Sequence, residues 1–244
     1  MDIRELVARR TDLSTFLVHL TRDGDEDEDT ALVRFQSIID DSELRARSMF
    51  GQAKTRLVDS GHKLKSQKCV CFTETPLEHI HLLLEEIDNR DCQFKPYGVA
   101  IPKKVGRSSG INPVWYLDMS QGPHHWLTHA ANGLLDDFLD LDEGVFTNPN
   151  VERLMPFIEQ MGTFPPTNFR KEFWWEREWR HQGHYSLPSR VIGLCPEDEI
   201  PELTEYARDS KTCLTKFRFI DPRWGLERII AHLAGFGRDD VEIL

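Results

Sequence analysis

The chain has 244 residues and a formal net charge of -11 at pH 7, with 39% hydrophobic and 10% aromatic residues. This composition is typical of a globular protein and excludes wholesale disorder, and the acidic charge argues against a general affinity for nucleic-acid backbones. The length fits one compact domain with insertions, so we predict a single domain over residues 1–244. No apolar run approaches the roughly 20 residues that a membrane helix requires, so we expect no membrane association.

The amino terminus and the cysteines indicate the compartment. Residues 1–16 mix charged side chains throughout and lack the continuous apolar core of a secretion signal. The five cysteines are an odd number without framework-like spacing, which favours reduced thiols over disulfides. We therefore expect a cytoplasmic protein.

The first elements are two buried strands that flank a helix. Residues 15–22 (TFLVHLTR) form an apolar, Thr- and Val-containing run that predicts a buried strand carrying His19. Residues 30–47 have apolar side chains at helical spacing, with Asp29 or Thr30 available as the N-cap.

A second buried strand follows a polar connection. Residues 51–68 are polar and basic without a clear period, which predicts an exposed connection. Residues 68–74 (KCVCFTE) alternate and contain β-branched and aromatic residues, so they are predicted as the strand.

A helix and two strands are predicted next. Residues 75–88 open with Thr75, Pro76 and Glu78, the arrangement of a capping box with proline at the first helical position. Residues 97–102 and 113–118 read as two strands joined by the glycine- and serine-bearing loop KKVGRSSGIN.

The rest of the chain alternates helices and strands, which predicts an α+β domain with a mixed, mostly antiparallel sheet and inserted helices. No G-x-G-x-x-G follows a strand and no phosphate-binding G-x-x-x-x-G-K-[ST] occurs, which argues against a doubly wound dinucleotide fold. The predicted elements are helices over 122–141, 148–162 (ending at Gly162), 196–209 and 222–235, strands over 173–180, 190–196 and 213–221, and a break at 164–167.

The segment FWWEREWRH (173–181) is the first candidate for chemistry. As a strand it places Trp174, Glu176, Glu178 and Arg180 on one face. Two carboxylates on one strand can hold a ribose hydroxyl and stabilise the positive charge that develops as a glycosidic bond breaks, and His19 on a neighbouring strand could fix the sugar. A helix would instead separate the two glutamates by about 200°, and a surface strand of weak ion pairs is the structural alternative.

The order of five stretches resembles a known family over most of the chain. The stretches are FLVHLTR (16–22), VCFTETP (70–76), YGVAIPKK (97–104), PVWYL (113–117) and WEREWR (175–180). Together they resemble the bacterial abortive phage resistance family of AbiGi type, which is similar to ADP-ribosyltransferase folds. The resemblance implies an ADP-ribosyltransferase-like fold and an anti-phage defence protein that acts as an NAD-dependent ADP-ribosyltransferase or NAD glycohydrolase, with NAD as substrate and no metal.

The resemblance also implies roles for individual residues. Glu178 matches the catalytic carboxylate, and Glu176 matches the orienting acidic position two residues earlier. His19 and Thr21 match positions at the nicotinamide ribose or the adenosine, and Thr73 matches the hydroxyl residue of the central strand.

Two further positions belong to the predicted NAD site. The resemblance also implies an aromatic residue that stacks on nicotinamide; Tyr97 and Tyr116 are both candidates, and spacing does not decide between them. Arg22 and the basic residues of the loop at 103–112 could neutralise a pyrophosphate or contact nucleic acid locally, although solvated surface is the default for such side chains.

Two alternatives remain open. Members of the AbiGi family are labelled antitoxins, so the chain could instead be a non-enzymatic partner of a toxin that uses Trp174, Trp175 and Trp179 as interface anchors. A metal-dependent nuclease would use His125 and His129 at helical spacing, His124 beside them, and the thiols of Cys69-x-Cys71. The H-E-x-x-H motif is absent, so small buried thiols and a polar helix face are the simpler interpretation.

Overall fold

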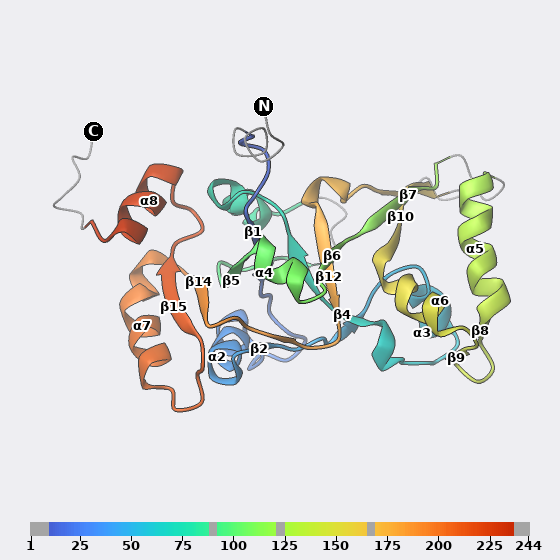
Figure 1. Ribbon diagram of the computed structural model, residues 1–244, viewed down its shortest axis with the longest axis horizontal. Helices are drawn as coiled ribbons and strands as arrows, with labels where there is room; N and C mark the ends of the chain where they lie inside the picture. The colour runs from blue at the N-terminus through green and yellow to red at the C-terminus, as the bar shows by residue number, and fades with distance from the viewer. Residues whose placement is uncertain (1–9, 88–91, 121–124, 165–168, 237–244) are drawn as a thin grey trace. The chain divides into compact units, whose positions relative to one another are not determined.

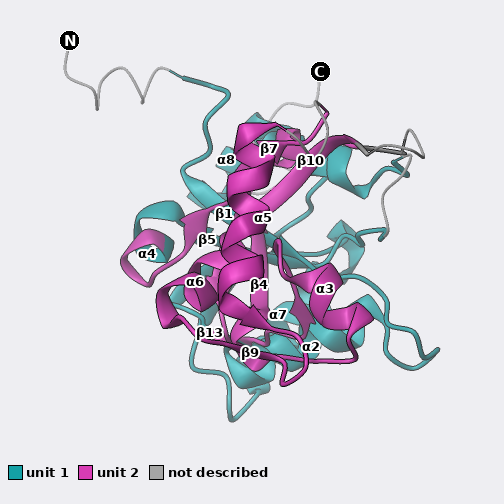
Figure 2. Cartoon of the chain, turned by 90° about the vertical axis from the view of Figure 1, so that its right-hand side faces the viewer, with its two compact units in different colours: residues 1–43, 74–106, 186–244 teal, residues 44–73, 107–185 magenta. Residues whose placement is uncertain are grey.

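The computed structural model describes residues 10–87, 92–120, 125–164 and 169–236. The chain divides into two compact units, each built from discontinuous segments (Figure 2). Unit 1 comprises residues 1–43, 74–106 and 186–244, and unit 2 comprises residues 44–73 and 107–185. The single domain predicted over residues 1–244 stays a prediction.

Unit 1 contains a set of four paired strands. They are β1 (Phe16–Leu20), β5 (Gly98–Pro102), β14 (Arg190–Leu194) and β15 (Lys216–Ile220). β5 pairs antiparallel with β1 and with β14, and β14 pairs parallel with β15. Because successive side chains alternate between faces, Val18 and Leu20 of β1 pack into an apolar core together with Ile192 and Leu194 of β14.

The helices of unit 1 pack on these strands through their apolar positions. Ile80 of the 3₁₀ helix η2 (Leu77–Leu84) and Ile229 of α8 (Leu226–Ala234) join the core that contains Val18. Phe35 of α2 (Ala31–Asp41) is fully buried beside the ring of Phe219 from β15. The helices of this unit are α2 (Ala31–Asp41), the 3₁₀ helices η2 (Leu77–Leu84) and η5 (Glu197–Glu199), α7 (Ile200–Asp209) and α8 (Leu226–Ala234).

Unit 2 contains separate groups of paired strands (Figure 1). In the first, β4 (Lys68–Thr73) pairs antiparallel with β3 (Ser48–Met49) and with β12 (Glu178–Gln182), which also pairs with β6 (Asn112–Pro113). In the second, β10 (Ile158–Phe164) pairs antiparallel with β11 (Phe169–Lys171) and parallel with β7 (Trp115–Asp118). A third pair joins β8 (Leu139–Asp140) to β9 (Val145–Phe146).

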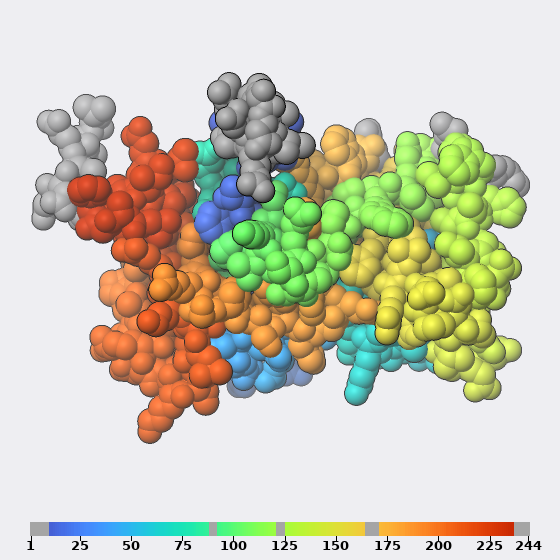
Figure 3. Space-filling view, in the orientation of Figure 1, coloured from blue at the N-terminus to red at the C-terminus, as the bar shows by residue number. Residues whose placement is uncertain are grey.

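The helices of unit 2 enclose a second apolar core. Leu57, Leu135, Val151 and Met155 are buried together in it. In the space-filling view, the yellow-green residues of α5 and the yellow residues of α6 lie on the surface of this unit (Figure 3). The helices are α3 (Lys54–Asp59), α5 (Trp126–Phe138), α6 (Pro149–Leu154) and the 3₁₀ helices η1 (Lys65–Gln67), η3 (Met155–Phe157) and η4 (Trp174–Glu176).

The predicted fold class is confirmed at the level of an α+β protein with mixed, mostly antiparallel strands and several helices. Short elements also occur where the chain passes from one unit to the other, namely β2 (Glu43–Leu44), α4 (Lys103–Ser108) and β13 (Tyr185–Ser186). The elements β1, β4, β5, β14, β15, α7 and α8 lie within their predicted ranges. The helix predicted over 30–47 is shorter, because α2 ends at Asp41 and β2 follows. The helix predicted over 122–141 is α5, which ends at Phe138 before β8, and residues 122–124 lie outside the described residues.

Two predicted connections are wrong. Residues 51–68 contain α3 and η1, because Ala53 and Leu57 lie one helical turn apart and are both fully buried. The predicted loop KKVGRSSGIN contains the helix α4, and the strands on either side of it pair with other strands, β5 with β1 and β14 and β7 with β10.

The predicted capping box at residues 75–78 is also wrong. The helix is the 3₁₀ helix η2 and begins at Leu77, so Pro76 occupies the cap position and makes no side-chain cap hydrogen bond. Glu78 is then the second helical residue, whereas a capping box requires the acidic residue at the third.

The helix predicted over 148–162 stops early. α6 ends at Leu154 and η3 ends at Phe157, and the strand β10 begins at Ile158. Met155 and Ile158 are both buried, so their spacing imitates a helical stripe although they belong to different elements. The strand predicted over 113–118 is likewise divided between β6 and β7, and the break predicted at 164–167 falls largely outside the described residues.

Within the described ranges, no helix combines the length and the apolar character that crossing a bilayer requires.

The cap of α2 gives a test of the local structure in unit 1. The hydroxyl of Thr30 accepts a hydrogen bond from the amide of Val33 at 3.3 Å. Thr30→Ala should therefore lower the free energy of unfolding by about 1 kcal/mol and speed hydrogen exchange at the Val33 amide. Urea denaturation and amide exchange measure the two effects. Thr30→Ser keeps the hydroxyl and should keep both properties near wild type; equal losses in both variants would contradict the cap.

Candidate functional site

The segment 173–180 is a turn followed by a strand, so the prediction of one strand with both glutamates on a shared face is wrong. Glu176 ends the 3₁₀ helix η4, and Glu178 begins β12. The residue between them, Arg177, has the left-handed backbone angles φ 48° and ψ 58°. This conformation is uncommon for a residue other than glycine, and it breaks the alternation of side chains that a continuous strand would impose.

Glu178 is held by Arg180, two residues further along β12. Nε of Arg180 donates to Oε1 of Glu178 at 2.9 Å, and Nη2 donates to Oε2 at 2.8 Å. This two-point arrangement fixes both oxygens of the carboxylate, because the planar guanidinium matches the carboxylate in shape. The predicted shared face of Glu178 and Arg180 is therefore confirmed.

Arg180 itself is almost completely buried. Its side chain is 2% exposed, and its other hydrogen bonds run to Oε2 of Glu159 at 2.7 Å and to the carbonyl of Pro156 at 2.5 Å. The ring of Phe50 lies against the guanidinium, with 5.0 Å between Cζ and the ring centroid. A buried cation is tolerated only when it is paired and hydrogen-bonded, and these contacts meet that requirement.

Lys171 completes a chain of alternating charges. It forms an ion pair and hydrogen bond with Oε1 of Glu159, the carboxylate whose other oxygen binds Arg180. Burial acts to raise the pKa of Glu159, but the charges of Arg180 and Lys171 and their hydrogen bonds outweigh it and hold that pKa below its ordinary value. Glu159 is therefore ionised at neutral pH.

Two hydroxyl groups position the backbone around Glu178. The hydroxyl of Tyr116 accepts a hydrogen bond from the amide of Glu178 at 2.9 Å, and the hydroxyl of Thr73 donates to the carbonyl of Glu176 at 2.5 Å. Burial, followed by the charge of Glu178, raises the pKa of Tyr116. The phenol thus remains protonated beside the predicted catalytic carboxylate.

The thiols predicted as candidate metal ligands lie on β4 beside β12. Cys71 pairs with Arg180 and Cys69 with Gln182 in the strand register. Burial raises the pKa of Cys69 to about 12, and burial together with the charge of Glu178 raises the pKa of Cys71 well above its ordinary value. Thiolates are therefore disfavoured at both positions. Among the described residues, no cluster of three His, Cys, Asp or Glu side chains is placed to hold a metal ion.

The remaining predicted NAD-site residues belong to unit 1. His19 lies on β1 opposite Val99 and is half-buried. Thr21 is buried, and its hydroxyl hydrogen-bonds to the carbonyl oxygens of Ala31 and Tyr97 at 3.1 and 3.2 Å. The prediction that these side chains meet Glu178 in one site joins residues of both units and stays a prediction.

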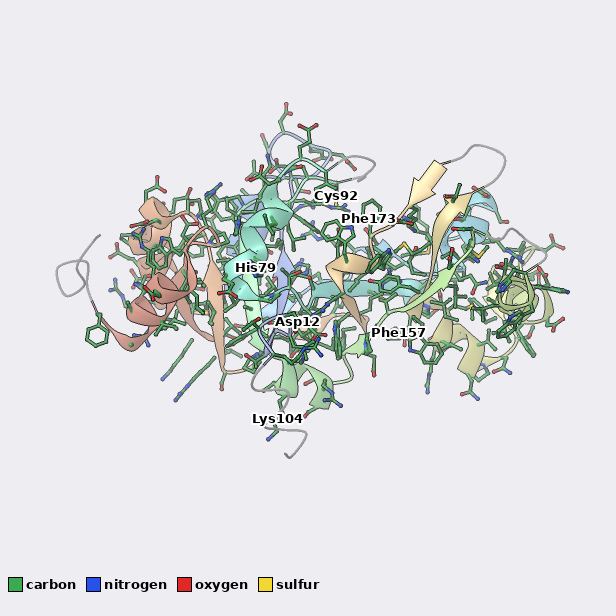
Figure 4. All side chains as sticks on the ribbon, turned by 90° about the horizontal axis from the view of Figure 1, so that it is seen from above. Asp12, His79, Cys92, Lys104, Phe157 and Phe173 are labelled. Carbon is green, nitrogen blue, oxygen red and sulfur yellow. The ribbon has the colours of Figure 1, made fainter. Side chains whose placement is uncertain are left out.

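Tyr97 and the predicted basic residues of unit 1 lie on several elements. The hydroxyl of Tyr97 donates to Oε1 of Glu199 at 2.8 Å, and its ring lies 6.1 Å from that of Phe35, centroid to centroid. Arg22 is exposed. Lys103 pairs with Glu74 at 2.7 Å, whereas Lys104 extends outward from α4 (Figure 4).

Tryptophans are exposed in the turn that precedes Glu178. Trp174 is 57% exposed and Trp175 is 41% exposed, whereas Trp179 on β12 is half-buried. Trp115 on β7 is also exposed. Solvent-facing tryptophans in a turn are suited to contact with a ligand or a partner, since such side chains supply large apolar area at low entropic cost.

The sequence did not indicate Glu159 and Lys171 as part of this arrangement. Glu159 falls within the helix predicted over 148–162, and Lys171 falls between the break predicted at 164–167 and the strand predicted over 173–180, so neither was assigned to a strand near β12. The spacing of Glu178 and Arg180 was the available signal, because residues two apart on a strand share a face. A buried arginine bound to one carboxylate leaves further donors that need acceptors, but the sequence does not say which residues supply them.

A scan against protein-family models finds no match to this chain. Searches of the curated proteins and of the solved structures likewise find no significant match.

The burial of Arg180 predicts a large effect on stability. Arg180→Met should lower the free energy of unfolding by about 3–5 kcal/mol, because it leaves the carboxylates of Glu159 and Glu178 without their shared partner. Arg56→Met provides the control, since Arg56 pairs with the exposed Asp136 in the same unit and should cost less than about 1 kcal/mol. Urea denaturation compares them, and equal losses in the two variants would contradict the central role of Arg180.

The lowered pKa of Glu159 predicts a pH dependence. A carboxylate whose pKa is depressed by folding contributes stability above its unfolded pKa, about 4.3, and this contribution is lost as the pH falls through the lower folded value. The stability advantage of wild type over Glu159→Gln should therefore be full at pH 7 and shrink below about pH 4.3. Urea denaturation from pH 7 to pH 3 measures the difference, and an advantage that grows on acidification would reverse the assigned sign.

Proposed function

We propose that this chain is a cytoplasmic anti-phage defence protein of abortive infection or toxin–antitoxin type that uses NAD as its substrate, as an ADP-ribosyltransferase-like enzyme or an NAD glycohydrolase. The observation that supports the proposal most is the state of Glu178. Its two carboxylate oxygens are fixed by the buried guanidinium of Arg180, and its backbone amide donates a hydrogen bond to the hydroxyl of Tyr116. A carboxylate oriented in this way can stabilise the positive charge that develops when the nicotinamide–ribose bond breaks.

The proposed chemistry is stabilisation of a developing positive charge. When the bond between the nicotinamide nitrogen and C1′ of the ribose breaks, nicotinamide leaves with the bonding electrons and the sugar becomes oxocarbenium-like. An ionised carboxylate that is already oriented stabilises this charge without a cost of reorganisation at the moment of reaction. Water or an acceptor nucleophile then bonds to C1′ and loses its proton.

The other proposed roles follow the resemblance to ADP-ribosyltransferases. Glu176, in the turn before β12, would orient the acceptor or the ribose, and His19 would position the sugar. Thr21, Arg22 and Thr73 would contact other parts of NAD, and Tyr97 or Tyr116 would stack on nicotinamide. No metal takes part in this proposal.

A partner-binding protein, such as the antitoxin of a neighbouring toxin, is the second candidate. It is favoured by the exposure of Trp174 and Trp175, which precede the charged network and would anchor a protein interface. In that case the ion pairs around Arg180 would hold the turn in shape, and NAD would not bind.

The decisive experiment is NAD binding and turnover by wild type and Glu178→Gln. We expect NAD to raise the melting temperature of both proteins by mass action, and nicotinamide release by the variant to fall by about 100-fold or more, because the substitution removes a charge at nearly constant shape. Circular dichroism and urea denaturation establish that the variant is folded under the assay conditions.

Glu143→Gln is the matched control. Glu143 is an exposed glutamate of the same unit, so the same chemical change there should leave nicotinamide release at the wild-type rate. Full turnover by folded Glu178→Gln would refute the role of Glu178. Wild-type protein that neither binds nor cleaves NAD would refute the enzyme and leave the partner-binding candidate.

A further inference from the structure

Three strands of unit 2 supply four charged side chains that alternate in sign. Lys171 comes from β11, Glu159 from β10, and Arg180 and Glu178 from β12. The ion pairs link them in the order Lys171, Glu159, Arg180, Glu178. The two cations differ in exposure: the side chain of Lys171 is 31% exposed, whereas that of Arg180 is 2% exposed.

The donors of Arg180 are divided between two sides of the guanidinium. Nε and one N–H of Nη2 face Glu178, while the second N–H of Nη2 binds Glu159 and Nη1 binds the carbonyl of Pro156. Phe50 lies over the plane of the group. Because the guanidinium is rigid and planar, fixing its far edge also fixes the two donors that hold Glu178.

The charges balance within the network. Glu159 accepts from both cations, so two carboxylates and two cations share the site and no uncompensated charge is buried. Without Glu159, Arg180 would lose the acceptor for one edge, and Lys171 would lose its ion pair. The orientation of Glu178 thus depends on a carboxylate to which it is linked through Arg180.

We propose that Glu159 is a positioning residue for Glu178, acting through Arg180 to set the angle and location of the catalytic carboxylate. This inference rests on the proposed NAD chemistry. Glu159 does not need to touch NAD in this role. Its contribution is to remove the freedom of Arg180 to tilt, so that the carboxylate of Glu178 keeps the geometry in which it stabilises the charged sugar.

The test separates positioning from simple stabilisation by measuring kcat and KM for NAD in Glu159→Gln. We expect kcat to fall by about 10-fold or more, since a small misplacement of a reacting group is enough for such a loss, while KM for NAD stays within about 3-fold of wild type. Rates are expressed per folded molecule, with the folded fraction taken from urea denaturation under the assay conditions.

Leu135→Ala is the control for a purely structural role. Leu135 lies in the apolar core of unit 2 and takes no part in the charged network, so this variant should lose stability and keep its kcat. Lys171→Met is the second variant, because it retains Glu159 and Arg180 and replaces a more exposed side chain; it should lower kcat in the same sense by a smaller factor.

Each outcome decides the inference. A fall in kcat at constant KM in Glu159→Gln, absent from Leu135→Ala, supports positioning. If Glu159→Gln does not fold, a fall in kcat for Lys171→Met supports it in the same way. Wild-type kcat per folded molecule in the Glu159 and Lys171 variants would overturn the positioning role while the proposed function stands, whereas absence of NAD cleavage by wild type would overturn both.

Discussion

The constraint on which unit 2 depends is the burial of the Arg180 guanidinium. Moving a cation out of water is costly, so the surrounding structure must provide acceptors on every accessible edge of the group. Glu178, Glu159 and the carbonyl of Pro156 supply them, from β12 itself, from β10 and from η3. Strands of two separate sheets, β12 and β10, and the helix η3 are thereby linked through one side chain.

The same constraint shapes the candidate site. Since Glu178 must meet Arg180 through two hydrogen bonds, its carboxylate has little rotational freedom. The left-handed backbone at Arg177 separates Glu178 from Glu176, and the two tryptophans of η4 that precede this turn are exposed. A fixed carboxylate next to exposed aromatic side chains is an arrangement that suits a nucleotide substrate or a partner protein, and NAD turnover distinguishes these uses.

Sequence patterns predicted the strands with strong alternation or continuous apolar runs, such as β1, β4 and β14, because burial of their side chains depends mainly on local residue types. They also placed Glu178 and Arg180 on one strand face. They failed where one residue altered the outcome. η2 begins one residue later than predicted, the left-handed backbone at Arg177 interrupts the expected strand, and Met155 with Ile158 imitates a helical stripe across a helix–strand boundary.

The sequence by itself determined the α+β class, the strands and helices with strong periodicity, and the shared strand face of Glu178 and Arg180, since these follow from periodicity and from the spacing of neighbouring residues. Only the tertiary structure decided that Glu159 and Lys171 complete the network and that Thr73 and Tyr116 hold the backbone beside Glu178. The physical reason is that a buried charge selects its partners by position in space. The chain brings those partners from strands far apart in sequence, and no local pattern records which ones will meet.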